Sequence, residues 1–156
     1  MANLVRLLLR VPVPWVFVLT YLVGEALEYV RPSTILRDRA QASMIAGGVL
    51  FALGAVIAGW GLAIFRKART TTVPGQPSVK LVTWGPYCYT RNPMYVGLTL
   101  AYLGEAGLLK QIWPVLVLPL MLAYLNWAVI PLEEAKLKEV FSNEYETYRS
   151  RVRRWI

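Results

Sequence analysis

One segment of the sequence, from Ala42 to Phe65, is predominantly apolar and carries no charged residue. A transmembrane helix needs about 20 consecutive apolar residues, so this run is long enough to span a bilayer. Two more apolar segments, Trp15–Val30 and Trp113–Ile130, are close to that length. A further one, Tyr95–Leu109, is shorter. Hydrophobic residues make up 56% of the chain, more than in an average soluble domain. We therefore predict an all-α integral membrane bundle with about four transmembrane helices.

The chain has 156 residues, which allows one compact unit, so we expect a single domain over residues 1–156. Its expected parts are two N-terminal membrane helices, a loop, a helical hairpin and a tail, at residues 1–65, 66–94, 95–130 and 131–156. The hairpin should be tight, because residues 110–112 alone separate its two apolar segments. Within the hairpin, Gly104 and Gly107 would let the two helices pack closely.

Basic side chains indicate how the chain is oriented. Most of the 17 Lys and Arg residues lie in three segments, residues 1–12, 66–94 and 131–156. An even number of spans puts all three segments on one side, and the positive-inside rule makes that side the cytoplasm. We therefore expect a multi-pass protein of the cell inner membrane with both termini in the cytoplasm.

The tail has the pattern of an amphipathic helix. Apolar residues recur at three- and four-residue steps from Leu137 to Val152, with charged residues between them. Such a helix should lie along the cytoplasmic membrane surface or pack against the other cytoplasmic loop. Ser142 and Asn143 are expected to interrupt it, because Asn143 followed by Glu146 has the pattern of a capping box.

The chain contains no histidine and a single cysteine, Cys88. Serine–histidine and cysteine–histidine nucleophile pairs, histidine zinc sites and an internal disulfide are therefore excluded. We expect no metal site, and any chemistry must use carboxylates, Tyr, Arg, Lys or a cofactor. The net charge of +8 does not indicate nucleic acid, because the basic residues flank apolar runs as membrane anchors do.

The segment TRNPMY has the pattern of a helix start. Asn is a favoured N-cap and Pro is favoured at the first helical position, so Asn92 should cap and Pro93 should begin the third membrane helix. The free N–H groups and the positive dipole end of such a start can bind an anion. Tyr87, Arg91 and Tyr95 crowd the same turn, either as ligand-binding groups or as membrane-interface anchors.

Glu133 and Glu134 stand just after the last apolar run. Adjacent residues of a helix point to different sides, so the two carboxyl groups are not a general acid/base pair. They can stabilise the N-terminus of a tail helix through its dipole. Alternatively, one of them faces inward and binds a cationic or hydroxyl-bearing ligand.

Taken in order, these segments resemble a known family. The succession of LVTxGPYxxxRNPMYxG, a helical hairpin and EExxLxxxFxxxYxxYxxxVxRW is similar to that of the isoprenylcysteine carboxyl methyltransferases. These are integral membrane enzymes that use S-adenosylmethionine, and phospholipid methyltransferases share parts of the pattern. The resemblance covers about residues 66–156, whereas the first two apolar segments carry no signature.

The resemblance implies methyl transfer from S-adenosylmethionine at the cytoplasmic membrane face. The acceptor would be a lipophilic small molecule, a lipid or a prenylated group that is methylated on a carboxylate, thiol or amine. By position, the expected cofactor-binding residues are Val79, Lys80, Leu81, Val82, Tyr87, Asn92, Pro93, Met94, Tyr95 and Glu133. The expected catalytic residues are Arg91, Tyr95, Glu133 and Glu134.

Two positions depart from the pattern of that family. Asn92 stands where the family has a His, so any role that needs an imidazole is lost. Val129 stands where the prenylcysteine enzymes have the Arg that binds the substrate carboxylate. The cofactor half of the site therefore resembles the family, while the acceptor half differs from it.

Two other functions remain open at the level of sequence. Glu25 and Glu28 lie in the first apolar segment, and four spans with such a carboxylate also resemble small multidrug exporters, in which Glu25 would be the working group. The two residues also lie close to Arg31, where ion pairing and snorkelling explain them without a function. A non-catalytic membrane scaffold is the third alternative.

Overall fold

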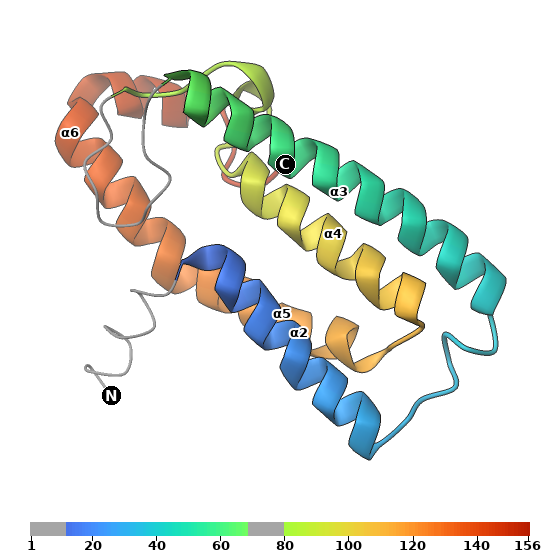
Figure 1. Cartoon of the computed structure of the whole chain (residues 1–156). Coiled ribbons are helices and arrows are strands. Elements are labelled where there is room, and N and C mark those ends of the chain that lie inside the picture. Colours follow the sequence, from blue (N-terminus) through green and yellow to red (C-terminus); the bar gives the residue numbers. More distant parts are fainter. Residues whose placement is uncertain (1–11, 69–79) are drawn as a thin grey trace.

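The computed structural model describes residues 12–68 and 80–156. Its elements, all helical, are α2 (Val13–Val30), α3 (Ala40–Ala68), the 3-10 turn η1 (Gly85–Cys88), α4 (Pro93–Leu109), α5 (Trp113–Tyr124), the π-helical turn η2 (Leu125–Val129) and α6 (Ile130–Arg151). The helices α2, α3, α4 and α5 run in alternating directions, and α6 continues α5 (Figure 1). The predicted all-α membrane bundle is confirmed for this part of the chain.

Three of the described helices are long and apolar enough to cross a membrane, namely α2, α3 and the continuous helix that begins at Trp113. The apolar part of the third helix ends at Ile130, and the charged tail follows it. α4 has 17 residues, so its length of about 26 Å is somewhat below the thickness of a bilayer core. It lies alongside α3 over its whole length (Figure 1).

The helices are arranged as two pairs, α3 with α4 and α2 with α5 (Figure 1). Glycines at every seventh position of α3 face α4 and let the two backbones approach closely. A Cβ atom added to Gly54 would lie 2.5 Å from the carbonyl oxygen of Gly97. α4 therefore packs against α3 through backbone, without room for side chains at this contact.

The prediction that Gly104 and Gly107 bring the third and fourth membrane helices together is wrong. Both glycines face α3 instead. A Cβ atom on Gly104 would lie 2.7 Å from the Gly47 carbonyl oxygen, and α4 makes far fewer contacts with α5 than with α3. The connection after α4 is short, as predicted. The small residues of α4 nevertheless pack against those of α3, so α5 packs against α2 instead.

The α2–α5 pair is joined at one end by Glu28, which is buried. Its carboxylate accepts hydrogen bonds from the backbone N–H groups of Ile112 at 3.0 Å and Trp113 at 3.3 Å, at the start of α5. It also accepts one from the N–H of Ser33 at 2.8 Å. Glu28 thus caps the start of α5, whereas Glu25, one turn earlier, is exposed.

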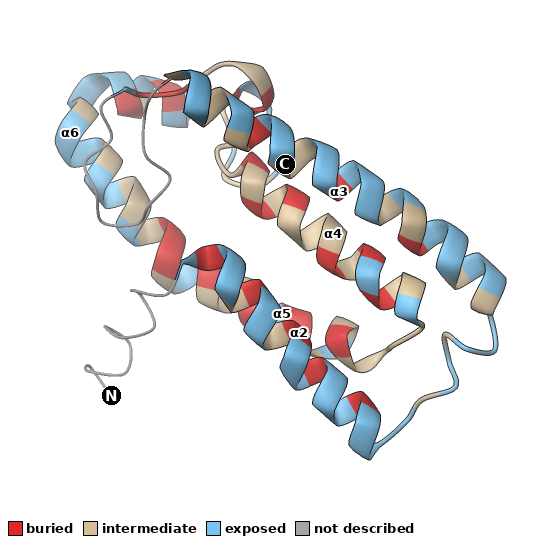
Figure 2. Cartoon of the chain, viewed as in Figure 1, coloured by how far each residue is buried: buried red, intermediate tan, exposed pale blue. Residues whose placement is uncertain are grey.

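The outer faces of the bundle are apolar, as expected in a bilayer. Figure 2 shows that most of α3 is exposed and that its buried positions form a narrow stripe toward α4. The exposed residues of α3 include Val49, Val56 and Trp60. In the centre, the Tyr102 ring makes edge-to-face contacts with Phe17 and Tyr21 and connects α4 to α2.

The tail continues the last membrane helix without a gap, because the backbone stays helical through Val129 and Ile130. Helical geometry breaks at Ser142, whose φ is 42° and ψ is −115°. The predicted interruption is confirmed at Ser142, whereas Asn143 keeps helical backbone angles. Beyond it, Tyr145 and Tyr148 pack on Leu81, and the chain turns back toward the start of α4 (Figure 1).

Candidate active site

The first part of the site is the turn before α4. Pro93 is the first helical residue and Asn92 is the N-cap, as the sequence predicts. The Asn92 side chain makes no capping bond, however. Its Nδ2 atom donates to the carbonyl oxygen of Arg154 at 2.9 Å, so it attaches the C-terminal segment to the turn instead.

The second part of the site is a hydrogen bond between Tyr95 and Glu133. The Tyr95 hydroxyl donates to Glu133 Oε1 at 2.7 Å, which joins α4 to α6. Burial raises the pKa of the Glu133 carboxyl, the charge of Glu134 adds to this, and the Tyr95 bond and Lys136 oppose it. Among the described residues, no Lys or Arg forms an ion pair with Glu133. The site therefore contains a carboxylate that is costly to ionise.

Glu134 has entirely different partners. Its Oε1 atom lies 2.9 Å from Arg91 Nη2, and its Oε2 atom lies 2.7 Å from Arg154 Nη2. The two carboxyl groups thus point to different sides, as predicted. The alternative in which the pair stabilises the start of a separate tail helix is wrong, because the Ile130 N–H donates to the Leu125 carbonyl and the helix does not begin there.

The third part is Tyr87, a buried residue of η1. Its carbonyl oxygen accepts a hydrogen bond from the Tyr148 hydroxyl at 2.8 Å, and its ring lies 5.2 Å from that of Phe65. Its own hydroxyl is buried and has no partner among the described residues. Burial raises the pKa of this hydroxyl, with smaller contributions from Tyr148 and Glu133.

The other predicted cofactor residues lie around these three parts. Leu81 and Val82 are buried just before η1, and Met94 lies against Gly61 of α3. The Lys80 ammonium lies 5.3 Å from the centre of the Trp84 ring. Val79 lies outside the described residues.

Sequence reasoning missed two members of this region. Asn126, in η2, accepts hydrogen bonds through Oδ1 from Arg154 Nη1 and Trp155 Nε1, both at 3.2 Å. The signal for Asn126 was present, since it is a polar residue inside an apolar run. The signal for Arg154 was weaker, because it stands among several arginines of a basic tail.

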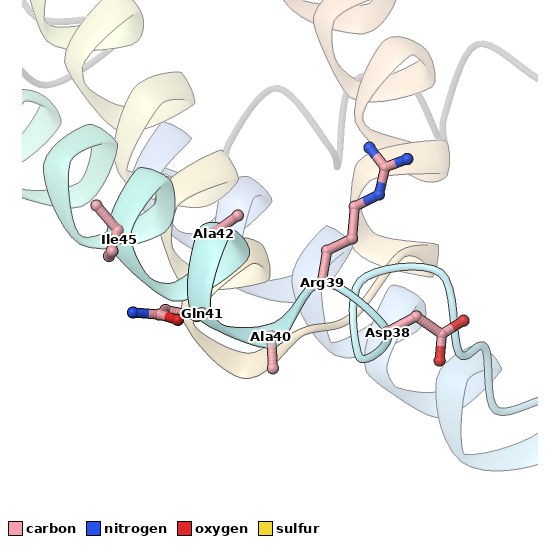
Figure 3. A pocket seen from close by; sticks show the side chains of 6 residues that line it. All are labelled: Asp38, Arg39, Ala40, Gln41, Ala42 and Ile45. Atoms are coloured by element: carbon pink, nitrogen blue, oxygen red, sulfur yellow. The ribbon is translucent and has the colours of Figure 1, made fainter.

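A hollow of about 440 Å³ lies elsewhere, at the start of α3 (Figure 3). It is wide open and is lined by Asp38, Arg39, Ala40, Gln41, Ala42 and Ile45. None of these residues belongs to the predicted site. In the described ranges, no group of three His, Cys, Asp or Glu side chains is placed to hold a metal ion.

Comparisons with known proteins agree with the sequence motifs. The protein-S-isoprenylcysteine O-methyltransferase of Schizosaccharomyces pombe is 40% identical to the chain over 72 residues. That match covers 46% of the chain and 30% of the relative, so the chain corresponds to less than a third of that protein. No solved structure gives a significant match.

The match to a family model is more extensive. The model described as phospholipid methyltransferase matches residues 42–144, more than half of the chain, from α3 into the second half of α6. This range includes Tyr87, Tyr95 and Glu133. The chain belongs to the phospholipid methyltransferase family.

Proposed function

We propose that the chain transfers a methyl group from S-adenosylmethionine to a lipophilic acceptor. The observation that carries this proposal is the half-buried Glu133 carboxylate, which is bound by Tyr95 and by no cationic side chain of the described residues. S-adenosylmethionine brings an ammonium group, a sulfonium group and ribose hydroxyls. Each of these can compensate a partly desolvated carboxylate that is otherwise costly to ionise.

The residues around Glu133 fit the rest of the cofactor. Leu81, Val82 and Met94 offer an apolar wall for the adenine ring. The Tyr87 hydroxyl, buried without a partner among the described residues, is available as a donor. Lys80, Asn92 and Pro93, together with Val79 outside the described residues, complete the proposed set.

When bound, the cofactor would supply a methyl group that is already activated. The part of the chain is then to position the reactants and exclude water, and good orientation contributes roughly 7–11 kcal/mol. A carboxylate or thiolate acceptor needs no general base. An amine acceptor must lose a proton, and Glu133, whose pKa burial raises, can accept it.

We further propose that the whole chain forms one methyltransferase domain in the inner membrane, with the site at the cytoplasmic face. The support is the positive charge near the site, where Arg91 and Arg154 bind Glu134 and Arg149 lies near Tyr145. Positive residues favour the cytoplasmic side. The acceptors to consider include phospholipids and prenylated thiols or carboxylates, since the relative named above is a prenylcysteine methyltransferase by name.

Binding of S-adenosylhomocysteine to the detergent-purified protein, measured by calorimetry, tests the proposal. We expect binding in the micromolar range, weakened at least tenfold by Glu133→Gln and by Tyr95→Phe. Glu139→Gln is the matched control, because Glu139 is an exposed carboxylate on the same helix. If the well-folded wild-type protein shows no binding, the proposed function is wrong.

A further inference from the structure

The chain ends in an extended segment, Val152–Ile156, here called the C-terminal strap. α6 ends at Arg151, and Val152 adopts extended backbone angles. From there the strap lies beside the start of α4 (Figure 1). It contacts two different parts of the bundle.

On one side the strap is bound to the turn before α4. The N–H of Arg91 donates to the Arg153 carbonyl oxygen at 2.9 Å. The Arg154 carbonyl oxygen accepts two more hydrogen bonds, from Thr90 Oγ1 at 3.0 Å and from Asn92 Nδ2 at 2.9 Å. Every residue of this turn from Thr90 to Asn92 therefore holds the strap.

On the other side the strap is bound to the helix that runs from α5 into α6. Arg154 donates two parallel bonds to Glu134, from Nε at 3.1 Å and from Nη2 at 2.7 Å. Two-pronged bonds of this kind between Arg and a carboxylate are strong and directional. Trp155 packs into the central apolar cluster, and its Nε1 atom donates to Asn126.

Glu134 completes the connection, because Arg91 also binds it directly. The carboxylate thus joins the α4 turn, the strap and α6 in one network. This network lies at the junction between the α3–α4 pair and the α2–α5 pair, at the start of α4. Further along α4 the two pairs meet through apolar side chains, such as Tyr102 against Phe17 and Tyr21. The Tyr95–Glu133 bond crosses the same junction.

We propose that Glu134 is a positioning residue, which holds the C-terminal strap between the two helix pairs through Arg91 and Arg154 and so sets the Tyr95–Glu133 contact. The inference rests on the proposed function, because that contact belongs to the proposed methyl-donor site. Glu134 and Arg91 were expected from the sequence to be catalytic. In this proposal they position other residues and do not touch the reacting atoms.

Hydrogen exchange measured by mass spectrometry tests the network without any ligand. In Glu134→Gln, exchange should rise together in residues 90–96 and 152–156 and stay unchanged in the middle of α3. Arg154→Lys keeps the charge but loses the two parallel bonds, and it should behave in the same way. Glu139→Gln is the control. Unchanged exchange of the strap in both Glu134→Gln and Arg154→Lys would overturn the proposal.

Affinity for S-adenosylhomocysteine separates positioning from a general loss of stability. We expect Glu134→Gln to weaken binding about tenfold, and the double variant with Tyr95→Phe to bind about as weakly as the weaker single variant. Effects that multiply in the double variant would show that Glu134 acts independently of the Tyr95–Glu133 contact, which contradicts the proposal. If the wild-type protein does not bind S-adenosylhomocysteine, the proposed function is wrong. The hydrogen-exchange experiment then tests on its own whether Glu134 holds the C-terminal strap.

Discussion

Tyr95 and Glu133 stand 38 positions apart in the chain and share a hydrogen bond of 2.7 Å. Tyr95 belongs to the α3–α4 pair, and Glu133 follows the helix that packs on α2. Their contact is therefore a sensitive measure of how the two pairs are placed. The Glu133 carboxylate also affects stability as well as binding, because partial burial makes it costly to ionise.

Glu133→Gln should leave the ligand-free protein at least as stable as the wild type at pH 7.5. Burial raises the pKa of the Glu133 carboxyl, so between its unfolded and folded pKa values the folded state binds more protons than the unfolded state. The stability of the wild type therefore falls as pH rises through this window, and the carboxylate opposes folding above it. Gln keeps an oxygen that accepts the Tyr95 bond and removes this pH dependence.

Thermal unfolding in detergent between pH 5 and pH 8 checks this expectation, with Glu139→Gln as the control. A Glu133→Gln variant that is clearly less stable than the wild type at every pH contradicts it. Together with weaker cofactor binding, the expected result would mean that the carboxylate is retained at a cost to the fold.

Gly54→Ala should destabilise the protein by about 1–3 kcal/mol, as overpacking does. The added Cβ atom would lie 2.5 Å from the Gly97 carbonyl oxygen, so α3 and α4 must move apart. Gly59→Ala is the matched control on the same helix, since a Cβ atom there meets nothing within 4 Å. That control should be neutral or stabilising, because Ala favours a helix over Gly. Equal effects in a thermal unfolding assay would show that the helix pairing described here is wrong.

Glu28→Gln should destabilise the protein by about 1–3 kcal/mol, because it weakens the bonds to the N–H groups of Ile112 and Trp113 at the start of α5. Glu25→Gln, one turn away and exposed, should have little effect on stability. The pair of variants also addresses the exporter alternative. Cation-driven transport by the wild type in liposomes, abolished by Glu25→Gln, would revive that alternative and count against the methyltransferase.

Ser142→Gly should stabilise the tail by about 1 kcal/mol, and Ser142→Ala should not. At φ 42° and ψ −115°, Ser142 has a backbone conformation that side chains with a Cβ atom rarely adopt. Gly adopts it without strain, whereas Ala keeps the Cβ atom. The difference can be measured by proteolysis of the tail in the folded protein. Equal protection in the two variants would mean that the break in α6 carries no strain.

The positions of the helices could be predicted from the sequence, because apolar runs and Pro93 mark them directly. Their pairing was predicted wrongly, because Gly104 and Gly107 were expected to face α5 and instead face α3. A short connection between α4 and α5 suggests that these helices pack together, but it constrains only their ends. The decisive information was the seven-residue spacing of small residues, Gly47 and Gly54 on α3 against Gly97 and Gly104 on α4, which reveals two matching faces only when both helices are compared.

The residues of the site could also be predicted only in part. Tyr95 and Glu133 were both expected near the cofactor from the family resemblance, and the structure brings them into contact. The partners of Glu134 could not be selected from sequence, because the tail offers several arginines at similar distances along the chain. The choice of Arg154 depends on the break at Ser142, which turns the chain back and carries its end to the α4 turn.

The range matched by the family model, residues 42–144, leaves out α2 and everything from Tyr145 onward. Yet α2 supplies the carboxylate that caps α5, and the last residues supply Arg154 between the two helix pairs. Residues 42–144 are thus enough to recognise the family, but contacts that hold the helices together also come from residues outside this range. In comparisons with more distant relatives, the flanks should be compared by the contacts they supply, since different sequences can provide the same cap and the same strap.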